Sequence, residues 1–236
     1  MSLVIKGFIE TSFIDWDGKV VSTLFLPRCN FRCPFCHNAG LVESPQNYET
    51  IPLSRIENFL QEHRDFIDGI CLTGGEPCLH VNAGLFEFLQ RIKQLGFAIK
   101  LDTNGADPNC LKKIIDQRLV DYLAMDIKAP LDERYEKLAG VKIDLNKIKQ
   151  SIELIRACGL PYEFRTTVVP TLLDNQDVAE IAEYLSGAKK FVLQQFVAEN
   201  AWDDSLRGLK PYLKEEFDEL IQVARKFIPQ TLARGV

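Results

Sequence analysis

Short apolar runs alternate with amphipathic stretches along most of the chain, and this alternation limits the folds that the chain can adopt. Five runs have the character of strands: Gly69 to Thr73, Phe97 to Thr103, Asp121 to Ile127, Tyr162 to Val169 and Lys189 to Phe196. Between them, apolar residues recur every three or four positions, as from Leu85 to Ile92. With an earlier run at Lys19 to Leu26, six strand-helix units follow one another, which predicts a parallel sheet with helices outside.

The beginning of the chain has a different pattern. Two strand-like runs, Phe8 to Ile14 and Lys19 to Leu26, flank a turn signal at Asp17-Gly18, so residues 1–26 are expected to form a hairpin that leads into the first barrel strand. A closed barrel of eight units typically needs about 250 residues. Six units therefore predict an α/β fold, a partial (β/α)6 barrel of the TIM type that is open on one side. No linker rich in Gly, Pro or Ser divides the chain, so a single domain over residues 1–236 is expected.

The composition is that of an ordinary globular protein. Of 236 residues, 46% are hydrophobic and 26% charged, and the net charge of -5 makes nucleic acid an unlikely partner. The segment from Met1 to Gly7 is too short and too soon interrupted by charge for a signal peptide, and no apolar run approaches the length of a membrane span. We therefore expect a cytoplasmic protein with no membrane partner.

Three cysteines, Cys29, Cys33 and Cys36, follow the first barrel strand in the spacing CxxxCxxC. Three crowded thiolates need a cation to balance them, so the choice lies between a metal and a disulfide. A disulfide would leave one thiol over. Zinc prefers four ligands and paired CxxC units, and the chain has no second CxxC, although His37 is a candidate fourth ligand. An iron-sulfur cluster fits better, because three cysteines leave one iron open, as catalytic metal sites require.

The other four cysteines, Cys71, Cys78, Cys110 and Cys158, have no metal-ligand spacing among themselves. Cys158 extends the apolar helix face that carries Ile155, which predicts a core position. Cys78 lies close to the presumed site, where a core or supporting position is expected rather than ligation. In a reducing compartment the cysteines are expected to be ligands or core residues rather than disulfide partners.

The cysteine spacing resembles that of the radical S-adenosylmethionine (radical SAM) family, which uses the same CxxxCxxC motif. The resemblance implies that Cys29, Cys33 and Cys36 hold a 4Fe-4S cluster whose open iron binds the amino and carboxylate groups of S-adenosylmethionine (SAM). Electron transfer from the reduced cluster would break the bond between the SAM sulfur and C5′ and give a 5′-deoxyadenosyl radical. The implied cofactors are therefore a 4Fe-4S cluster and SAM.

Polar residues gather at the C-terminal ends of the predicted strands, where barrel enzymes place their chemistry. The candidate cofactor-binding residues among them are Gly74, Gly75, Glu76, Asp102, Thr103, Asn104, Lys128 and Arg165. The two glycines let backbone groups approach a ligand, and Glu76 supplies an acceptor. In radical SAM proteins a similar motif lies along the methionine amino group, whereas an ordinary strand-to-helix turn is the alternative.

The stretches Asp102 to Gly105 and Met125 to Lys128 resemble those of the pyruvate formate-lyase activating enzyme. The resemblance implies that Asp102 and Asp126 help to hold a monovalent cation beside the SAM carboxylate, which Lys128 and Arg165 would contact. A salt bridge between Lys128 and one of the aspartates is the alternative.

The chain departs from that activating enzyme in one respect. The enzyme has a late histidine that reaches SAM, whereas the three histidines here are His37, His63 and His80, none of them in the last third of the chain. Gln194 or Gln195 is the candidate replacement. His37 matches the activase pattern directly after the cluster motif, or is an ordinary loop residue.

The resemblance extends over nearly the whole chain and is closest to the activases of glycyl radical enzymes, in particular the anaerobic ribonucleoside-triphosphate reductase activating proteins. It implies hydrogen abstraction from a glycine of a partner enzyme, with a flavodoxin or ferredoxin as electron donor. Two alternatives stay open. One is a radical SAM enzyme that acts on a small molecule or modified nucleoside, such as a deazaguanine precursor, and the other is a metal-binding interaction module without catalysis.

Overall fold

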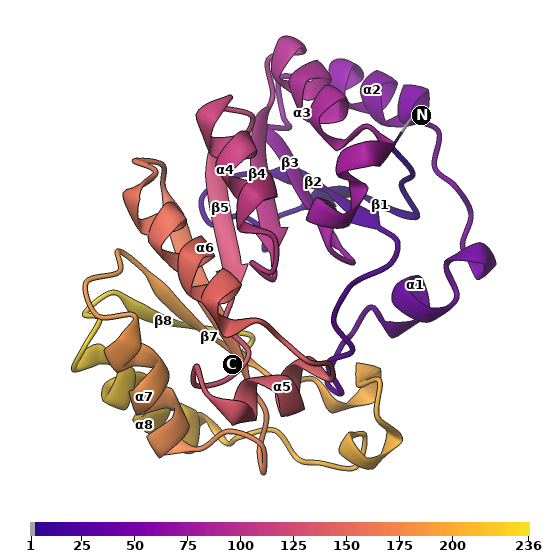
Figure 1. Ribbon diagram of the computed structural model, residues 1–236. Coiled ribbons are helices and arrows are strands. Elements are labelled where there is room, and N and C mark those ends of the chain that lie inside the picture. The colour runs from indigo at the N-terminus through magenta and orange to yellow at the C-terminus, as the bar shows by residue number, and fades with distance from the viewer. Residues whose placement is uncertain (1–2) are drawn as a thin grey trace.

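The computed structural model describes residues 3–236, so Met1 and Ser2 of the expected domain lie outside the described residues. One eight-stranded sheet runs through the protein, with its strands side by side in the order of the sequence (Figure 1). The strands are β1 (Gly7–Ser12), β2 (Val21–Leu26), β3 (Gly69–Gly74), β4 (Ala98–Thr103), β5 (Tyr122–Asp126), β6 (Tyr162–Val168), β7 (Phe191–Gln195) and β8 (Thr231–Arg234). Strands β1 and β2 are antiparallel, and every following pair is parallel.

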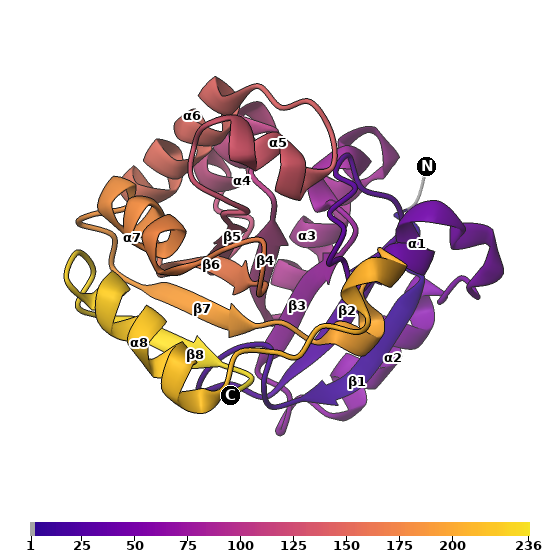
Figure 2. The same ribbon diagram turned by 90° about the horizontal axis from the view of Figure 1, so that it is seen from below.

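Helices connect the parallel strands and lie outside the curved sheet (Figures 1 and 2). They are α1 (Ala39–Glu43), α2 (Leu53–Glu62), α3 (Leu85–Gln94), α4 (Pro108–Asp116), α5 (Glu133–Ala139), α6 (Leu145–Ala157), α7 (Asn175–Tyr184) and α8 (Lys214–Arg225). Four short 3-10 helices join them: η1 (Pro45–Asn47), η2 (Pro77–Ala83), η3 (Ala198–Asn200) and η4 (Asp204–Leu206). Within residues 3–236, no helix is both long enough and apolar enough to cross a bilayer.

The predicted fold is confirmed, with one addition. The hairpin precedes six parallel strands as expected, but a seventh parallel strand, β8, pairs with β7 and widens the partial barrel. The sequence gives little sign of β8, because it is only four residues long and three of them, Leu232, Ala233 and Arg234, are not buried. Strands β1 and β8 form the two edges of the sheet (Figure 2).

The two faces of the sheet have opposite chemistry. Side chains alternate along each strand, so Ile99 and Leu101 of β4 face the helices and are fully buried, while Lys100 between them faces the barrel interior. The register places Lys100 beside Cys71 of β3, which in turn lies beside Thr23 of β2. The apolar core therefore lies between sheet and helices, and the interior of the barrel is polar.

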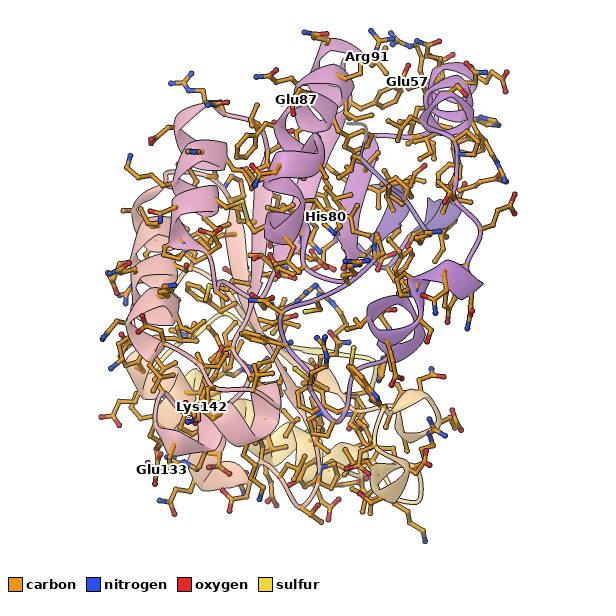
Figure 3. All side chains as sticks on the ribbon, turned by 45° about the vertical axis from the view of Figure 1, so that its right-hand side comes forward. Glu57, His80, Glu87, Arg91, Glu133 and Lys142 are labelled. Carbon is orange, nitrogen blue, oxygen red and sulfur yellow. A yellow bond between two sulfur atoms is a disulfide. The ribbon has the colours of Figure 1, made fainter. Side chains whose placement is uncertain are left out.

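Contacts on the outer surface fix neighbouring helices relative to one another. Arg91 of α3 donates two hydrogen bonds to Glu57 of α2, at 3.2 and 3.0 Å (Figure 3). Across the open side, Nη2 of Arg234 in β8 lies 3.3 Å from the Asp17 carboxylate in the hairpin loop. This ion pair joins the first and the last structural units of the barrel.

The structure corrects two expectations about the cysteines. Cys78 of η2 and Cys110 of α4 form a disulfide with a Cα–Cα distance of 5.8 Å, because the segments after β3 and β4 lie side by side although 32 residues separate the two positions. Cys158 is only half-buried, since it lies at the C-terminal end of α6, where its thiol donates to the Ile155 carbonyl oxygen.

Candidate active site

A cavity of about 500 Å³ opens at the C-terminal ends of the strands. It is lined by every residue that the sequence nominates for cluster, SAM or cation: Cys29, Cys33, Cys36, Gly74, Gly75, Glu76, Asp102, Thr103, Asn104, Asp126, Lys128 and Arg165. A larger hollow of about 780 Å³ lies on the outer surface between α4 and α6 and contains none of them. Convergence of twelve nominated residues, and not size, identifies the candidate site.

Backbone hydrogen bonds fix the cysteine loop to three other segments. The Arg28 amide donates to the Leu41 carbonyl of α1, the Arg28 carbonyl accepts from the Glu76 amide, and the Arg32 amide donates to the Ala139 carbonyl at the end of α5. The ring of His80, which lies in the interior of the protein (Figure 3), bonds to the Pro27 carbonyl at 2.8 Å, directly before the loop. The loop is therefore held before any cofactor binds.

The three cysteines of the loop are free, and their surroundings favour a cationic partner. Burial raises the pKa of Cys29 to about 12 and that of Cys33 to about 11, so these thiols ionise only when a positive charge compensates the thiolates. Within residues 3–236, no three His, Cys, Asp or Glu side chains come close enough to hold a single metal ion.

The glycines Gly74 and Gly75 are required by packing against the neighbouring strand. A Cβ on Gly75 would lie 1.6 Å from the Arg28 carbonyl oxygen, and Gly74 has φ +103° with the backbone of Leu26 2.6 Å from a would-be Cβ. The strand end of β3 therefore contacts the start of the cysteine loop directly. These glycines therefore serve a close approach within the chain itself, and the expected approach to a ligand stays a prediction.

Glu76 joins two loops of the site. Its buried carboxylate accepts hydrogen bonds from the Thr103 hydroxyl and the Asn104 amide, both at 2.8 Å, and from the Cys78 amide at 3.2 Å. Burial raises the pKa of Glu76 to about 7, against the effect of these bonds. The Glu76 carboxylate, which the sequence predicts to accept hydrogen bonds from a ligand, thus accepts them from the loop after β4.

Asn104 continues the connection to the cysteine loop. Its side-chain amide donates to Asn30 Oδ1 at 2.7 Å and lies 3.6 Å from Sγ of Cys29. On the other side of the cavity, the Asn38 amide donates to the Gly74 carbonyl at 3.1 Å. The three loops of the site therefore form one hydrogen-bonded unit.

Two aspartates and their cations form the floor of the cavity. Arg165 donates to Asp126 Oδ1 through Nε and to Asp102 Oδ2 through Nη1, both at 2.8 Å. Lys128 pairs with Asp126 Oδ2 at 3.1 Å, which is the salt bridge that the sequence leaves open. Burial raises the pKa of each carboxyl, but Arg165 and the neighbouring lysine, Lys100 or Lys128, hold both pKa values below the usual range, so both aspartates are ionised.

Lys100, which lies behind this floor and does not line the cavity, is the residue that the sequence interpretation missed. Its Nζ lies 2.8 Å from Asp102 Oδ1, and the residue is only 1% exposed. A lysine inside an otherwise apolar strand, two positions before an aspartate, was the available signal, because buried lysines are nearly always paired.

The two aspartates offer a poor binding site for the predicted monovalent cation. Each of the four oxygens of Asp102 and Asp126 already has a cationic nitrogen of Lys100, Arg165 or Lys128 within 3.1 Å, although the contact of Lys100 with Asp102 Oδ1 is an ion pair and that oxygen has no hydrogen-bond partner within the described residues. A metal ion would have to enter among three positive charges, so these residues do not fit an additional cation.

The residues proposed to replace a late histidine also lie in the cavity wall. Gln194 and Gln195 both line it, as does His37. The Gln195 amide nitrogen donates to the Tyr212 carbonyl at 2.8 Å, and its buried Oε1 has no hydrogen-bond partner within the described residues. Whether one of the glutamines contacts SAM stays a prediction.

Comparison with known proteins identifies the family in which this arrangement of residues occurs. Residues 23–186, from the first parallel strand through the helix after β6, match the Radical SAM superfamily. The chain belongs to the radical SAM superfamily. Membership implies a 4Fe-4S cluster and SAM as cofactors. The thiols of Cys29 and Cys33, whose raised pKa values call for a compensating positive charge, fit such a cluster.

Relatives within the superfamily differ in the share of their own length that aligns with this chain. A Methanocaldococcus jannaschii protein, provisionally named a glycyl-radical enzyme activating enzyme, is 31% identical over 241 aligned residues, which cover 100% of this chain and 98% of the relative. GTP 3′,8-cyclase of Helicobacter pylori is 27% identical over 190 residues, covering 78% of this chain but 57% of the cyclase. Among solved structures, a domain of the pyruvate-formate lyase-activating enzyme from Bacteroides vulgatus superposes with a TM-score of 0.58 at 20% identity, over 71% of this chain and 99% of that domain, which supports the fold.

Proposed function

We propose that this radical SAM enzyme is an activase that installs a glycyl radical on a partner enzyme. The observation that carries the proposal is the full-length similarity, at 31% identity, to a protein named as such an activating enzyme. The cyclases, in contrast, match this chain over little more than half of their own length.

The open side of the barrel suits a protein substrate. Strands β1 and β8 are the edges of the sheet, and the cavity extends from the cysteines to Ile14 in the hairpin loop and Gly235 after β8. Ile14 is 76% exposed. A glycine-bearing loop of a partner could reach the cavity on this side, beside the ion pair of Asp17 with Arg234 that bridges the two edges.

Some side chains of the site would bind the cluster, and others would orient SAM. Cys29, Cys33 and Cys36 would hold the cluster, and Arg165 and Lys128 would face the SAM carboxylate. When bound and reduced, the cluster would supply the electron for cleavage of SAM. The 5′-deoxyadenosyl radical formed by that cleavage would take hydrogen from the glycine α-carbon. The aspartates of the cavity floor fix both cationic side chains, so the site is charged and ordered before SAM arrives.

The proposed partner is an anaerobic ribonucleotide reductase, in line with the sequence resemblance. We propose a flavodoxin or ferredoxin as electron donor, because Arg28 and Arg32 flank the cysteine loop and suit an acidic protein surface. Action on a small nucleotide is the second candidate, which the similarity to GTP 3′,8-cyclases favours.

Electron paramagnetic resonance tests the proposal. The reconstituted chain is incubated without oxygen with SAM, a reductant and the candidate reductase, and a glycyl doublet is expected on the reductase. Cys33→Ala should abolish both the iron and the doublet. SAM cleavage without a doublet on any glycyl radical enzyme supplied would favour a small-molecule substrate, and the absence of iron and of SAM cleavage would favour a non-catalytic module.

A further inference from the structure

Behind the floor of the cavity lies a fully enclosed lysine, which does not line the cavity and which the implied chemistry does not require. Lys100 projects from the middle of β4 into the barrel and is 1% exposed. Its ammonium group donates to the Asp15 carbonyl oxygen at 2.7 Å and pairs with Asp102 at 2.8 Å. Burying a lysine costs free energy unless such partners compensate the charge, so we expect the ammonium group to have a specific role at this position.

The ligands of Lys100 are those that a monovalent metal ion would take. Hard cations bind carboxylate and carbonyl oxygens, and the ammonium group of Lys100 has one of each, from Asp102 and Asp15. Burial lowers the pKa of Lys100, but the Asp102 carboxylate more than offsets this effect and raises the pKa overall. The group is therefore a permanent positive charge at a fixed position.

The charge balance of the floor also leaves no place for a second cation. Among the directly ion-paired groups, two carboxylates, Asp102 and Asp126, face three cationic side chains, Lys100, Arg165 and Lys128, so this set carries one positive charge in excess. The neighbouring Asp15 and Glu163 carboxylates bond elsewhere, to Thr23 and to Lys190 and Arg234. The carboxylate of SAM would neutralise that excess. An added metal ion would instead double it in a buried site, where unbalanced charge is expensive.

We propose that the Lys100 ammonium group is the resident cation of the SAM-carboxylate site, so that this chain binds SAM without a monovalent metal ion. Lys100 is a positioning residue. It neutralises Asp102, and Asp102 in turn fixes Nη1 of Arg165, the side chain that faces the SAM carboxylate. The proposal rests on membership of the radical SAM superfamily and on SAM binding, and it does not depend on the glycyl radical partner.

The test measures SAM affinity as a function of the cation present. The reconstituted full chain is titrated with SAM anaerobically, with tetramethylammonium as the only other cation or with Na⁺ or K⁺ at the same ionic strength of about 0.1 M. The native chain should bind SAM with dissociation constants that agree within about twofold in all three buffers. Affinity that improves about tenfold with Na⁺ or K⁺ would overturn the proposal.

The variant Lys100→Ala removes the charge and leaves room for an ion. It should bind SAM about tenfold more weakly in tetramethylammonium and recover most of that loss in Na⁺ or K⁺. A loss that no ion restores would show that Lys100 acts through packing and would contradict the proposal. Lys112→Ala removes an exposed lysine that is paired with Asp116 on α4, and should change neither affinity nor ion dependence.

A second variant covers the case in which Lys100→Ala does not fold, as judged by circular dichroism. Lys100→Met keeps most of the side-chain volume without the charge, so SAM affinity should fall and stay low in every buffer, because the space for an ion remains filled. Native affinity of Lys100→Met would overturn the proposal. All arms measure binding in the absence of a partner protein, so an incorrect activase assignment would not affect them.

Discussion

Nδ2 of Asn104 lies 3.6 Å from Sγ of Cys29, so the loop after β4 reaches the first cysteine of the cluster loop. Hydrogen bonds to cluster sulfurs are one of the features that set the reduction potential of an iron-sulfur centre. Asn104 therefore lines the candidate cavity and is also placed to influence the reduction potential of the cluster.

Asn104→Ala should make the reduction potential of the cluster more negative. A hydrogen bond contributes about 1 kcal/mol, which for a one-electron couple corresponds to a shift on the order of 40 mV. Potentiometric titration followed by electron paramagnetic resonance measures it. Asn38→Ala is the matched control, because the Asn38 side chain bonds to the Gly74 carbonyl, and a similar shift in this control would contradict the assigned role of Asn104.

Glu76→Ala should lower stability more than it lowers intrinsic SAM affinity. The substitution leaves the Thr103 hydroxyl and the Asn104 amide without their acceptor in a buried place, which costs about 2 to 3 kcal/mol in the free energy of unfolding. Urea denaturation and SAM titration separate the two effects. A large loss of affinity at unchanged stability would mean that the carboxylate binds SAM directly.

Gly75→Ala should prevent the cysteine loop from docking on the end of β3. Its Cβ would overlap the Arg28 carbonyl oxygen, and backbone must move to relieve that contact, at a cost of about 3 kcal/mol or more. The variant should also retain less iron per chain after reconstitution. Gly208→Ala, where nothing lies within 4 Å of the new Cβ, should stay within about 0.5 kcal/mol of the native chain, and equal behaviour of the two variants would refute the packing argument.

Glu163→Gln should remove part of the acid sensitivity of folding. Glu163 is 1% exposed and pairs with Lys190 and Arg234 at 3.0 and 2.9 Å. Burial raises the pKa of Glu163, but Arg234 and the other cations of the interior lower it to about 2, below its ordinary value of 4.5. The ionised carboxylate therefore stabilises the fold at pH 7, and this contribution is lost as the pH falls from about 4.5 towards 2.

At pH 7 the variant should be about 3 kcal/mol less stable, because two half-buried cations, Lys190 and Arg234, lose their buried partner and keep only Asp17. The difference from the native chain should shrink between pH 4.5 and pH 2, as urea titrations at several pH values would record. Asp116→Asn, which changes an exposed carboxylate paired with Lys112, should show almost no difference at any pH. A constant gap for Glu163→Gln over the whole pH range would contradict the role of its ionisation.

The sequence predicts the parallel barrel and the members of the site well, because both follow from local patterns. The period-two alternation around Ile99 and Leu101 defines a strand, and polar residues at strand ends must meet at one edge of a parallel sheet. What the sequence does not predict is pairing across the barrel. The disulfide between Cys78 and Cys110 and the bond from Glu76 to Asn104 depend on how two loops pack, which no local pattern encodes.

Lys100 marks the same limit. Its position in β4 follows from the register, but its role follows from the simultaneous presence of Asp102, Arg165 and the Asp15 carbonyl, which come from three distant parts of the chain. The strand β8 was missed for a different reason, since four residues with two of them exposed carry too weak a pattern.

Transfer of deuterium tests the central claim, that this radical SAM enzyme takes hydrogen from a glycine of a protein partner, most directly. The candidate ribonucleotide reductase is produced with α-deuterated glycine and incubated anaerobically with the reconstituted chain, SAM and a reductant, and 5′-deoxyadenosine is analysed by mass spectrometry. We expect deuterium in 5′-deoxyadenosine in proportion to the glycyl doublet, and none with Cys33→Ala. A full yield of 5′-deoxyadenosine without deuterium, in the presence of the doublet, would contradict direct abstraction from glycine.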